Sequence, residues 1–520
     1  MMLVLANADI PRLALDPATV RMLAWALGGY VLFLLAISIY ASRRVQTEAD
    51  YLVAGRRLPL FLAWGTLIAT WFGAATMFAA AGQAREVGLL GVVLDPLACA
   101  GTLVLAGIFF ARPLWKMELY TMADFYRVKY GPAAEVVGAC IQVPSYFAWV
   151  ALQYMALAKV LELYFGIPLA VGIVIVAAVT LTYTMIGGMW SVTLTDTFQI
   201  VIALAGLVVL LGATLSHPAL GDGDPLLGLR AVYEKVAASH PDHLRLVPAE
   251  LKAAALLPWL AAWATGLFGN IPGQDLQQRV FAAKSPNVAM QACILAGVLY
   301  LVFGMIPVTL GLASLVTHPN GTLDPVGFLA GENLSPGMLV VFMVAVVSMV
   351  VSTATSAVLA PATILGHNLL SRIPGLDIRP LFRDRACVVI VSLGGICLAM
   401  GGKSLMELLD VALSIQLVAL FVPVVMGIYG RPRGQLPAVL SMLMGFGAWL
   451  VTFVIHELAG ETSAGPAAVI TAVPSDFWGL GCGMLGYLIG QTLSPARIAP
   501  GAGSAEPNKM PCEEAPGSIA

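Results

Sequence analysis

The sequence predicts an all-α polytopic membrane protein with about 13 transmembrane helices. Of its 520 residues, 59% are hydrophobic and only 11% carry a charge, whereas a soluble domain carries about 25% charged residues. The hydrophobic residues gather in stretches of about 20, the length that a helix needs to cross the hydrocarbon core of a bilayer. A lipid bilayer is therefore the first expected partner.

The thirteen spans are numbered 0 to 12 along the chain. Their approximate cores are residues 22–41, 59–82, 89–111, 133–163, 167–186, 190–215, 254–277, 288–315, 337–366, 386–402, 406–429, 436–457 and 475–494. Of the 27 lysines and arginines, 18 fall in loops on one side of this series. Short loops rich in these residues face the cytoplasm. We therefore expect a multi-pass protein of the plasma (inner) membrane, with its N-terminus outside and its C-terminus in the cytoplasm.

We expect three parts in the chain, an extracellular N-terminal segment, a transmembrane domain and a disordered cytoplasmic tail, at residues 1–20, 21–494 and 495–520. The tail is small, polar and proline-containing, which is typical of disorder. Two outer loops are long. Residues 216–253 are mixed polar, with a short helix expected around Leu229 to Ala238, and residues 317–336 are rich in Gly, Pro and Asn.

Composition and spacing exclude several classes of function. No basic tract indicates nucleic-acid binding. The seven cysteines are scattered and no histidine has metal-ligand spacing, so neither a disulfide framework nor a zinc site is expected. The sequence contains no motif for reaction chemistry, and we do not expect an enzyme.

Span 1 is interrupted near its middle. The run LIATWFGAATMFA (Leu67–Ala79) places Thr70, Trp71, Gly73 and Thr76 close together in an apolar span. Gly73 weakens the helix locally, and loosened backbone at membrane depth is tolerated only where protein or a water-filled cavity receives the freed groups. Two interpretations follow: a broken helix whose carbonyls hold an ion and a solute, or a face of small residues for close helix packing.

Span 6 is interrupted in a similar way, because the run ATGLFGNIPGQ (Ala264–Gln274) places Gly and Pro around Asn270. The two interrupted spans lie five apart, so they run antiparallel. Interrupted spans at matching positions in two halves indicate a transporter site between inverted repeats. We therefore expect repeats of five helices, spans 1–5 and 6–10, at about residues 59–215 and 254–429, with helices 1 and 6 discontinuous.

Span 8 concentrates hydroxyl groups in an apolar helix, at Ser348, Ser352, Thr353, Thr355 and Ser356. Sodium is a hard cation that takes oxygen ligands, as calcium and magnesium do. Hydroxyls and the freed carbonyls of a broken helix supply such ligands. The alternative is that each hydroxyl bonds back to the carbonyl four residues earlier, and both interpretations stay open.

Asp196 lies one to two turns into span 5. An ionisable residue within a span is costly and is by default a functional hypothesis. An acid near the N-terminal end of a helix is also favoured by the helix dipole. The two interpretations are compatible.

Four motifs give the chain a family resemblance. The run GGMWSVTLTDTFQ (Gly187–Gln199) resembles the GG-x-x-S-V-x-x-T-D-x-x-Q signature of the sodium:solute symporter family. The runs at Asp50–Thr70, Phe109–Gly131 and Ile271–Pro286 are similar to that family's entry to span 1, inner loop after span 2 and exit from span 6. The resemblance covers roughly residues 48 to 430. It implies a LeuT-type fold of inverted five-helix repeats, in agreement with the span count.

The resemblance also implies a sodium site between spans 1 and 8. Span 1 would offer backbone carbonyls, and span 8 would offer one carbonyl and two adjacent hydroxyls. The matching residues are Ala69, Phe72, Met349, Ser352 and Thr353. Asp196 matches the family's span-5 acid, which is linked there to sodium coupling. Sodium is the co-transported ion that this set implies.

The resemblance leaves the solute open. Sugar-carrying members have an Asn and a Gln at the positions of Trp71 and Thr76, so a sugar is disfavoured. The sequences of spans 2 and 6 resemble the choline-transporter branch more than the sugar-carrying members. In that branch an aromatic cage can hold a quaternary ammonium. Trp71 and Trp149 match two cage positions, but Cys99 and Gly273 stand where that branch has further aromatics. The expected solute contacts are Trp71, Thr76, Trp149, Gln153, Asn270 and Gln274.

Asp95 and Asp275 are left out of the expected site. Both lie in or near spans, close to predicted ends, where a charged side chain can reach the membrane surface.

Three functions are compatible with these patterns. The first is sodium-coupled uptake of a small organic solute by alternating access. The second is a symporter-like membrane sensor; with no kinase expected in the 520 residues, it would need a separate signalling partner. The third is a proton-coupled transporter with a vestigial sodium site. The identity of the solute, the sodium stoichiometry and the oligomeric state are not determined by these patterns.

Overall fold

The computed structural model describes residues 16–43, 47–320, 324–375, 378–401, 404–459 and 470–495. Within these ranges the chain is a set of helices with no strand. Most of the expected N-terminal segment and nearly all of the expected tail lie outside the described residues. The expectation of an all-α fold is confirmed.

The helices of the first half surround the broken span 1. They are α1 (Pro17–Ser42), α2 (Glu48–Val53), α3 (Leu60–Trp71), α4 (Ala80–Glu86), α5 (Cys99–Leu105), α6 (Arg112–Trp115), α7 (Met122–Lys129), α8 (Pro132–Phe165) and α9 (Leu169–Leu215). Short π-helical segments at Ala75–Ala79, Val93–Ala98 and Ala106–Ala111 join α3 to α4 and frame α5.

The second half contains the broken span 6 and the helices that follow it. They are α10 (Pro225–Ser239), α11 (Ala253–Phe268), α12 (Gln274–Ala282), α13 (Pro286–Thr317), α14 (Pro325–Asn333), α15 (Pro336–Ile364), α16 (Pro380–Ala399), α17 (Leu405–Gln416), α18 (Val422–Tyr429), α19 (Leu436–Ala459) and α21 (Ser475–Leu493).

Nine of the described helices are long and apolar enough to cross a membrane, and the bent pair α3 and α4 makes ten. The remaining expected spans are also helical in the structure, as α11 with α12, α16 and α21. Spans 4 and 5 are the two helical halves of α9, which is interrupted at Gly188, where φ is +52° and ψ is −152°. A Cβ at Gly188 would lie 2.4 Å from the ring of Tyr51, so both the backbone angle and the close approach require glycine.

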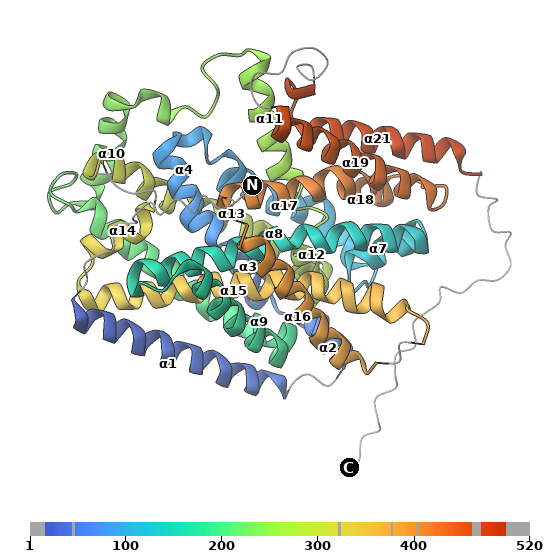
Figure 1. Ribbon diagram of the computed structural model, residues 1–520, viewed down its shortest axis with the longest axis horizontal. Helices are drawn as coiled ribbons and strands as arrows, with labels where there is room; N and C mark the ends of the chain where they lie inside the picture. Colours follow the sequence, from blue (N-terminus) through green and yellow to red (C-terminus); the bar gives the residue numbers. More distant parts are fainter. Residues whose placement is uncertain are drawn as a thin grey trace.

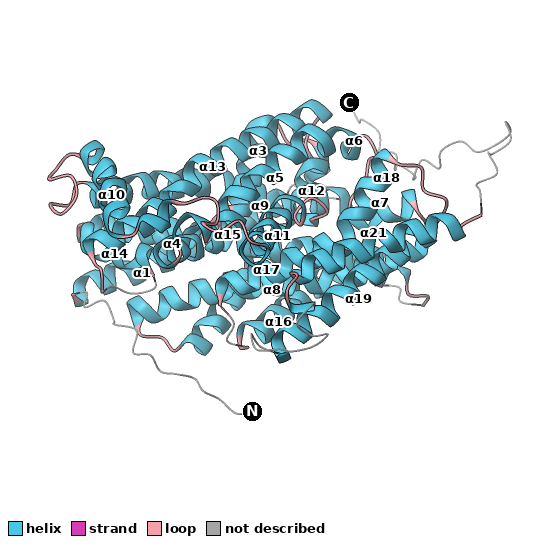
Figure 2. Cartoon of the chain, turned by 90° about the horizontal axis from the view of Figure 1, so that it is seen from above, coloured by secondary structure: helices cyan, strands magenta, loops and turns pink. Residues whose placement is uncertain are grey.

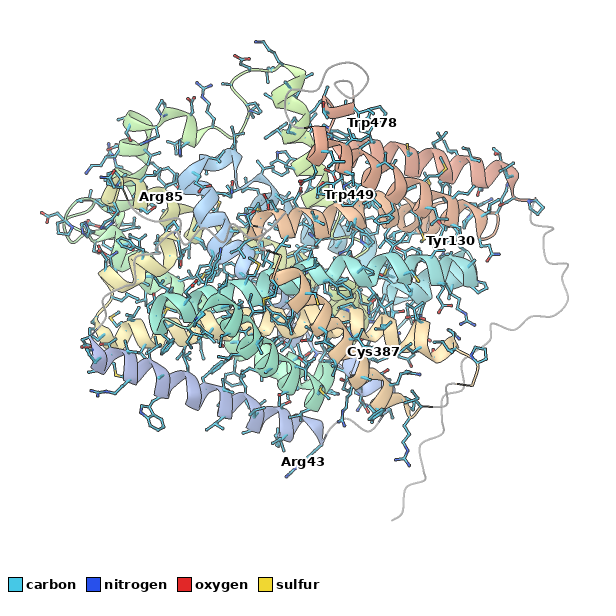
Figure 3. The ribbon with its side chains drawn as sticks, viewed as in Figure 1. Arg43, Arg85, Tyr130, Cys387, Trp449 and Trp478 are labelled. Atoms are coloured by element: carbon cyan, nitrogen blue, oxygen red, sulfur yellow. The ribbon has the colours of Figure 1, made fainter. Side chains whose placement is uncertain are left out.

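The loops separate to the two ends of the helix bundle, with α10 and α14 at the left and α7 and α18 at the right (Figures 1 and 2). Arg56 donates to Leu119 O at 2.5 Å, so the loop after α2 meets the loop before α7. The helix α7, at the right end, carries Arg127 and Lys129 in its last turn. Figure 3 places Tyr130 toward this end and Arg85 toward the other. We call the right end the basic end. Its assignment to the cytoplasm stays a prediction.

Two expectations for the connecting segments have different outcomes. The short helix expected around Leu229 to Ala238 is confirmed as α10. The outer loop expected at residues 317–336 contains a short helix, α14, that was not among the expected elements. Two residues mark the start of α14. The Asp324 side chain caps the helix by accepting a hydrogen bond from Gly327 N at 3.2 Å, and Pro325 occupies the first helical position.

The helix α15 forms the centre of the fold. Every residue from Ser348 to Ile364 is buried, and α15 packs against α3, α8, α9 and α16. A polar group on this stretch is therefore held in a fixed position against the neighbouring helices. The hydroxyl-rich segment of span 8 belongs to this stretch.

Candidate functional site

The first helix break separates α3 from the Ala75–Ala79 segment. The helix leaves its regular path at Phe72, where ψ is 74°, and the axes of its two halves differ by 57°. The backbone N–H of Ala74 has lost its helical partner and donates to Gln153 Oε1 at 3.1 Å. A side chain from α8 thus satisfies the opened backbone, as membrane burial requires.

Hydroxyls of α15 cover the carbonyl side of this break. Thr353 Oγ1 lies 3.1 Å from Ala69 O and 3.3 Å from Met349 O. Ser352 Oγ lies 3.4 Å from Ala69 O. Gly73 packs directly on this group, since a Cβ there would lie 2.6 Å from Thr353 Oγ1.

The structure therefore brings together four of the five residues expected to hold sodium, Ala69, Met349, Ser352 and Thr353. The fifth, Phe72, is the residue at which α3 ends, and all five are buried. Neutral oxygens of this kind suit a hard monovalent cation. Among the described residues, no group of three His, Cys, Asp or Glu side chains could hold a metal ion.

Asp196 of α9 joins this oxygen set. Its side chain is fully buried. Thr66 Oγ1 donates to one carboxylate oxygen at 2.6 Å, and Ser352 Oγ donates to the other through a short hydrogen bond. Ser352 has one hydroxyl proton, so donation to Asp196 leaves its lone pairs available to a cation. Asp196 therefore both orients Ser352 and adds negative charge to the site.

Arg279 of α12 connects the two helix breaks. It is fully buried, and its guanidinium donates to Ser356 Oγ at 2.6 Å and to the backbone oxygen of Asp275 at 3.1 Å. Thr70 Oγ1 lies 3.2 Å from the same Ser356 oxygen. From the sequence alone, Arg279 is expected among the lysines and arginines in loops on the cytoplasmic side. The break before α12 instead places its side chain against α15.

A cavity lies between the two breaks. Its lining comes from both breaks, from the Val93–Ala98 segment, and from α5, α8, α13 and α17. It consists of Trp71, Ala75, Asp95, Cys99, Trp149, Gln153, Asn270, Asp275, Tyr300, Leu409, Ala412, Leu413 and Gln416. The space open to the centres of water-sized molecules is about 30 Å³, enough for about two waters. Of the six expected solute contacts, Trp71, Trp149, Gln153 and Asn270 belong to this lining.

Thr76 and Gln274 do not belong to the lining. Thr76 Oγ1 lies behind it, 2.9 Å from an oxygen of Asp95. The side chain of Gln274 turns toward α7 instead, accepting from Met122 N at 2.7 Å and donating to Tyr120 O at 3.3 Å. The reason is position: Gln274 is the first residue of α12 and faces the loop that precedes α7.

Asp95 and Asp275, which were left out of the expected site, line the cavity and are 2% and 3% exposed. Because both lie near predicted span ends, their side chains were expected to reach the membrane surface, and this expectation was wrong. Asp275 lies in the first turn after the second break, and such a break brings a helix start into the interior. That signal was present in the sequence. Asp95 lies in the π-helical segment before α5, which no spacing rule indicated.

Aromatic donors hold both carboxylates. Trp71 Nε1 donates to Asp275 at 2.6 Å and Tyr146 OH donates to its other oxygen at 2.5 Å. Tyr300 OH donates to Asp95 at 2.7 Å. The rings of Trp71 and Tyr300 meet edge to face, with centroids 6.4 Å apart. The cavity therefore combines aromatic rings with oriented carboxylates.

Comparison with known proteins gives concordant matches. The model of the sodium:solute symporter family matches residues 51–445. The high affinity choline transporter 1 of Homo sapiens is 25% identical over 367 residues, 65% of this chain and 60% of that protein. Its Caenorhabditis elegans counterpart is 26% identical over 401 residues, 71% of this chain and 65% of that protein. The sodium/glucose cotransporter of Vibrio parahaemolyticus is 24% identical over 317 residues, 59% of this chain and 57% of that protein. The matched part thus spans less than two thirds of these relatives.

Solved structures show the same fold. A Na⁺-coupled sialic acid symporter in its substrate-bound outward-open state aligns with a TM-score of 0.72 at 16% identity, over 91% of this chain and 97% of that one. A nucleobase-cation-symport-1 family transporter aligns with a TM-score of 0.56 at 16% identity, over 86% and 95%. The expected LeuT-type fold is thereby confirmed. With its helix breaks in place and the family model matching from residue 51 to residue 445, the chain belongs to the sodium:solute symporter family.

Proposed function

We propose that this chain is a sodium-coupled symporter that carries a small organic solute into the cell by alternating access. The observation that supports this proposal most is the oxygen set at the first break. There Thr353 and Ser352 approach Ala69 O at 3.1 and 3.4 Å, next to the buried carboxylate of Asp196. Helix packing alone needs neither the carboxylate nor the clustered hydroxyls.

Sodium in this set links α3 to α15. Its ligands are the carbonyls of Ala69, Phe72 and Met349 and the hydroxyls of Ser352 and Thr353. The ion draws the two helices together and favours the conformation in which both sides of the site are in contact. Asp196 couples this event to α9, since its carboxylate holds both Ser352 and Thr66 of α3.

The solute binds in the cavity beside the ion. Trp71 contacts the cavity with its side chain, while its neighbour Phe72 provides a carbonyl to the ion site. Binding at one site therefore orders the backbone that also forms the other site. By thermodynamic linkage, each ligand raises the affinity for the other by the same factor.

Uptake into proteoliposomes tests the proposal. The purified chain is reconstituted and given an inward sodium gradient, an inward proton gradient or neither, with radiolabelled solutes chosen by a thermal-shift screen of amines, carboxylates, amino acids and sugars in sodium. We expect accumulation that requires the sodium gradient. Accumulation driven by the proton gradient alone favours the proton-coupled alternative. Sodium-dependent binding without accumulation of any solute favours the sensor.

A further inference from the structure

Two carboxylates face one small cavity, and only neutral groups hold them. Asp95 receives hydrogen bonds from Tyr300 and Thr76, and Asp275 receives them from Trp71 and Tyr146. In the part of the chain that the structure describes, neither carboxylate forms an ion pair, and no lysine, arginine or histidine belongs to the lining. When both carboxylates are ionised, they give the cavity a negative electrostatic potential.

The charges around the two breaks do not balance in the protein alone. Within the described residues the buried carboxylates here are Asp95, Asp196 and Asp275, and the buried cation here is Arg279. With all three carboxylates ionised, two negative charges are left in excess in a region shielded from water, where an uncompensated charge is strongly unfavourable. Sodium at the first break neutralises one of them. A solute with a single positive charge neutralises the other, whereas an anionic solute makes the imbalance larger.

The type of cation follows from the acceptors. Each oxygen of Asp95 and Asp275 has one hydrogen-bond donor in the structure, and a carboxylate oxygen can accept more than one. A protonated amine can fill these positions with N–H groups and form charge-assisted hydrogen bonds. A quaternary ammonium has no N–H, so it would leave them unfilled. The faces of Trp71 and Trp149 attract either cation and do not discriminate between the two.

Two further polar atoms in the lining residues are without a partner among the described residues. They are Nε2 of Gln153, a donor, and Oε1 of Gln416, an acceptor. The orientation of Gln153 follows from the bond between its Oε1 and Ala74 N. A donor and an acceptor together match a hydroxyl group, which accepts and donates.

We propose that the solute is a small protonated amine that also carries a hydroxyl, bound through N–H groups to Asp95 and Asp275. This inference rests on the proposed function, since the cavity is taken to be the solute site of the symporter. It adds the chemical class of the solute.

A methylation series tests the inference. Ethanolamine, N-methylethanolamine, N,N-dimethylethanolamine and choline share one hydroxyl and lose N–H groups in steps; ethylamine lacks the hydroxyl and glycolate reverses the charge. Binding to the purified full chain is measured as the rise in its unfolding midpoint, in sodium and in potassium. We expect ethanolamine to bind at least roughly tenfold more tightly than choline, ethylamine to bind more weakly than ethanolamine, and glycolate not to bind.

Asp95→Asn preserves the shape of the side chain and removes its charge. We expect it to weaken ethanolamine binding by at least roughly tenfold while the rise in midpoint caused by sodium alone is retained. Asp222→Asn, in an exposed loop, is the matched control and should bind as the unmodified chain does. If Asp95→Asn does not fold, Asp275→Asn takes its place with the same expected loss.

The outcomes separate the two proposals. Tighter binding of choline than of ethanolamine, binding of glycolate, or unchanged ethanolamine binding in the Asp95 variant overturns the amine assignment. If sodium then still stabilises the chain and drives uptake of another solute, the proposed symport stands. If sodium neither stabilises the chain nor drives any uptake, the symport proposal itself fails.

Discussion

At the first break, between α3 and α4, the carbonyl of Ala69 meets the hydroxyls of Ser352 and Thr353, which carry lone pairs of their own. At the second break, between α11 and α12, two carbonyls accept hydrogen bonds from side-chain amides. Gln142 Nε2 donates to Pro272 O at 2.7 Å and Gln277 Nε2 donates to Ile271 O at 2.7 Å.

The same backbone interruption therefore has two chemical outcomes. The side-chain amides of Gln142 and Gln277 donate to these two carbonyls, and an amide nitrogen has no lone pair to offer a cation. Hydroxyls can turn their protons elsewhere, as Ser352 does toward Asp196, and present oxygen to an ion. In the proposed account, the side chains that face a break, rather than the break itself, decide whether it can hold an ion.

The largest expected effect on sodium affinity comes from the double variant Ser352→Ala with Thr353→Ala. It removes both hydroxyl ligands while the carbonyls remain. We expect the sodium concentration for half-maximal uptake to rise more than roughly tenfold, since each lost charge-assisted contact contributes about 1.5–3 kcal/mol. Thr363→Ala is the control on the same helix, because its hydroxyl bonds back to Leu359 O. Unaltered sodium dependence in the double variant would remove the site from the first break.

Asp196→Asn should have the next largest effect. It removes a negative charge beside the site, and the amide can accept the hydroxyl protons of Thr66 and Ser352 with only one oxygen. We expect a several-fold rise in the half-maximal sodium concentration, on the order of 1 kcal/mol. The measurement is the sodium titration of uptake. Tighter sodium binding in this variant would contradict the assigned role of the carboxylate.

Gly73→Ala tests the close approach at the first break. The new Cβ would lie 2.6 Å from Thr353 Oγ1, so the threonine has to turn or α3 has to move. We expect a smaller, roughly two- to five-fold, loss of sodium affinity. Gly212→Ala in α9 is the matched control, since its Cβ meets nothing within 4 Å. Equal sodium titrations for the two variants would show that the packing of Gly73 on Thr353 is not required.

Gln142→Ala should change stability and leave sodium affinity as it is. The variant leaves the buried carbonyl of Pro272 without its donor, which costs about 1–3 kcal/mol of folding free energy. We expect a lower unfolding midpoint and an unchanged half-maximal sodium concentration. A shift in sodium affinity as large as that of the Ser352 and Thr353 double variant would mean that the two breaks do not differ in the way described.

The sequence predicts the class of fold well, because apolar spans of membrane length leave few alternatives to helices. It also locates both breaks, since Gly73 and Pro272 mark them directly. The partners of the breaks are harder to predict. Ser352 and Thr353 could be placed only through the family resemblance, and the capping role of Gln142 depends on a contact across 130 positions of sequence.

The solute cavity is predicted less completely. Trp71 and Gln153 lie where the sequence suggests, but Asp95 and Asp275 were assigned to the membrane edge by their distance from the predicted span ends. Distance along the sequence fails as a measure of depth wherever a helix is broken or π-helical, as it is before both residues. Tyr300, on α13, has no local signal and is recognised only through its hydrogen bond to Asp95.

Direct binding of radioactive sodium to the purified chain tests the central claim most directly. The measurement compares the unmodified chain, the Ser352→Ala and Thr353→Ala double variant, and Gln142→Ala. The account predicts saturable sodium binding in the unmodified chain and in Gln142→Ala, and loss of that binding in the double variant. Sodium binding of unchanged affinity in the double variant would contradict it.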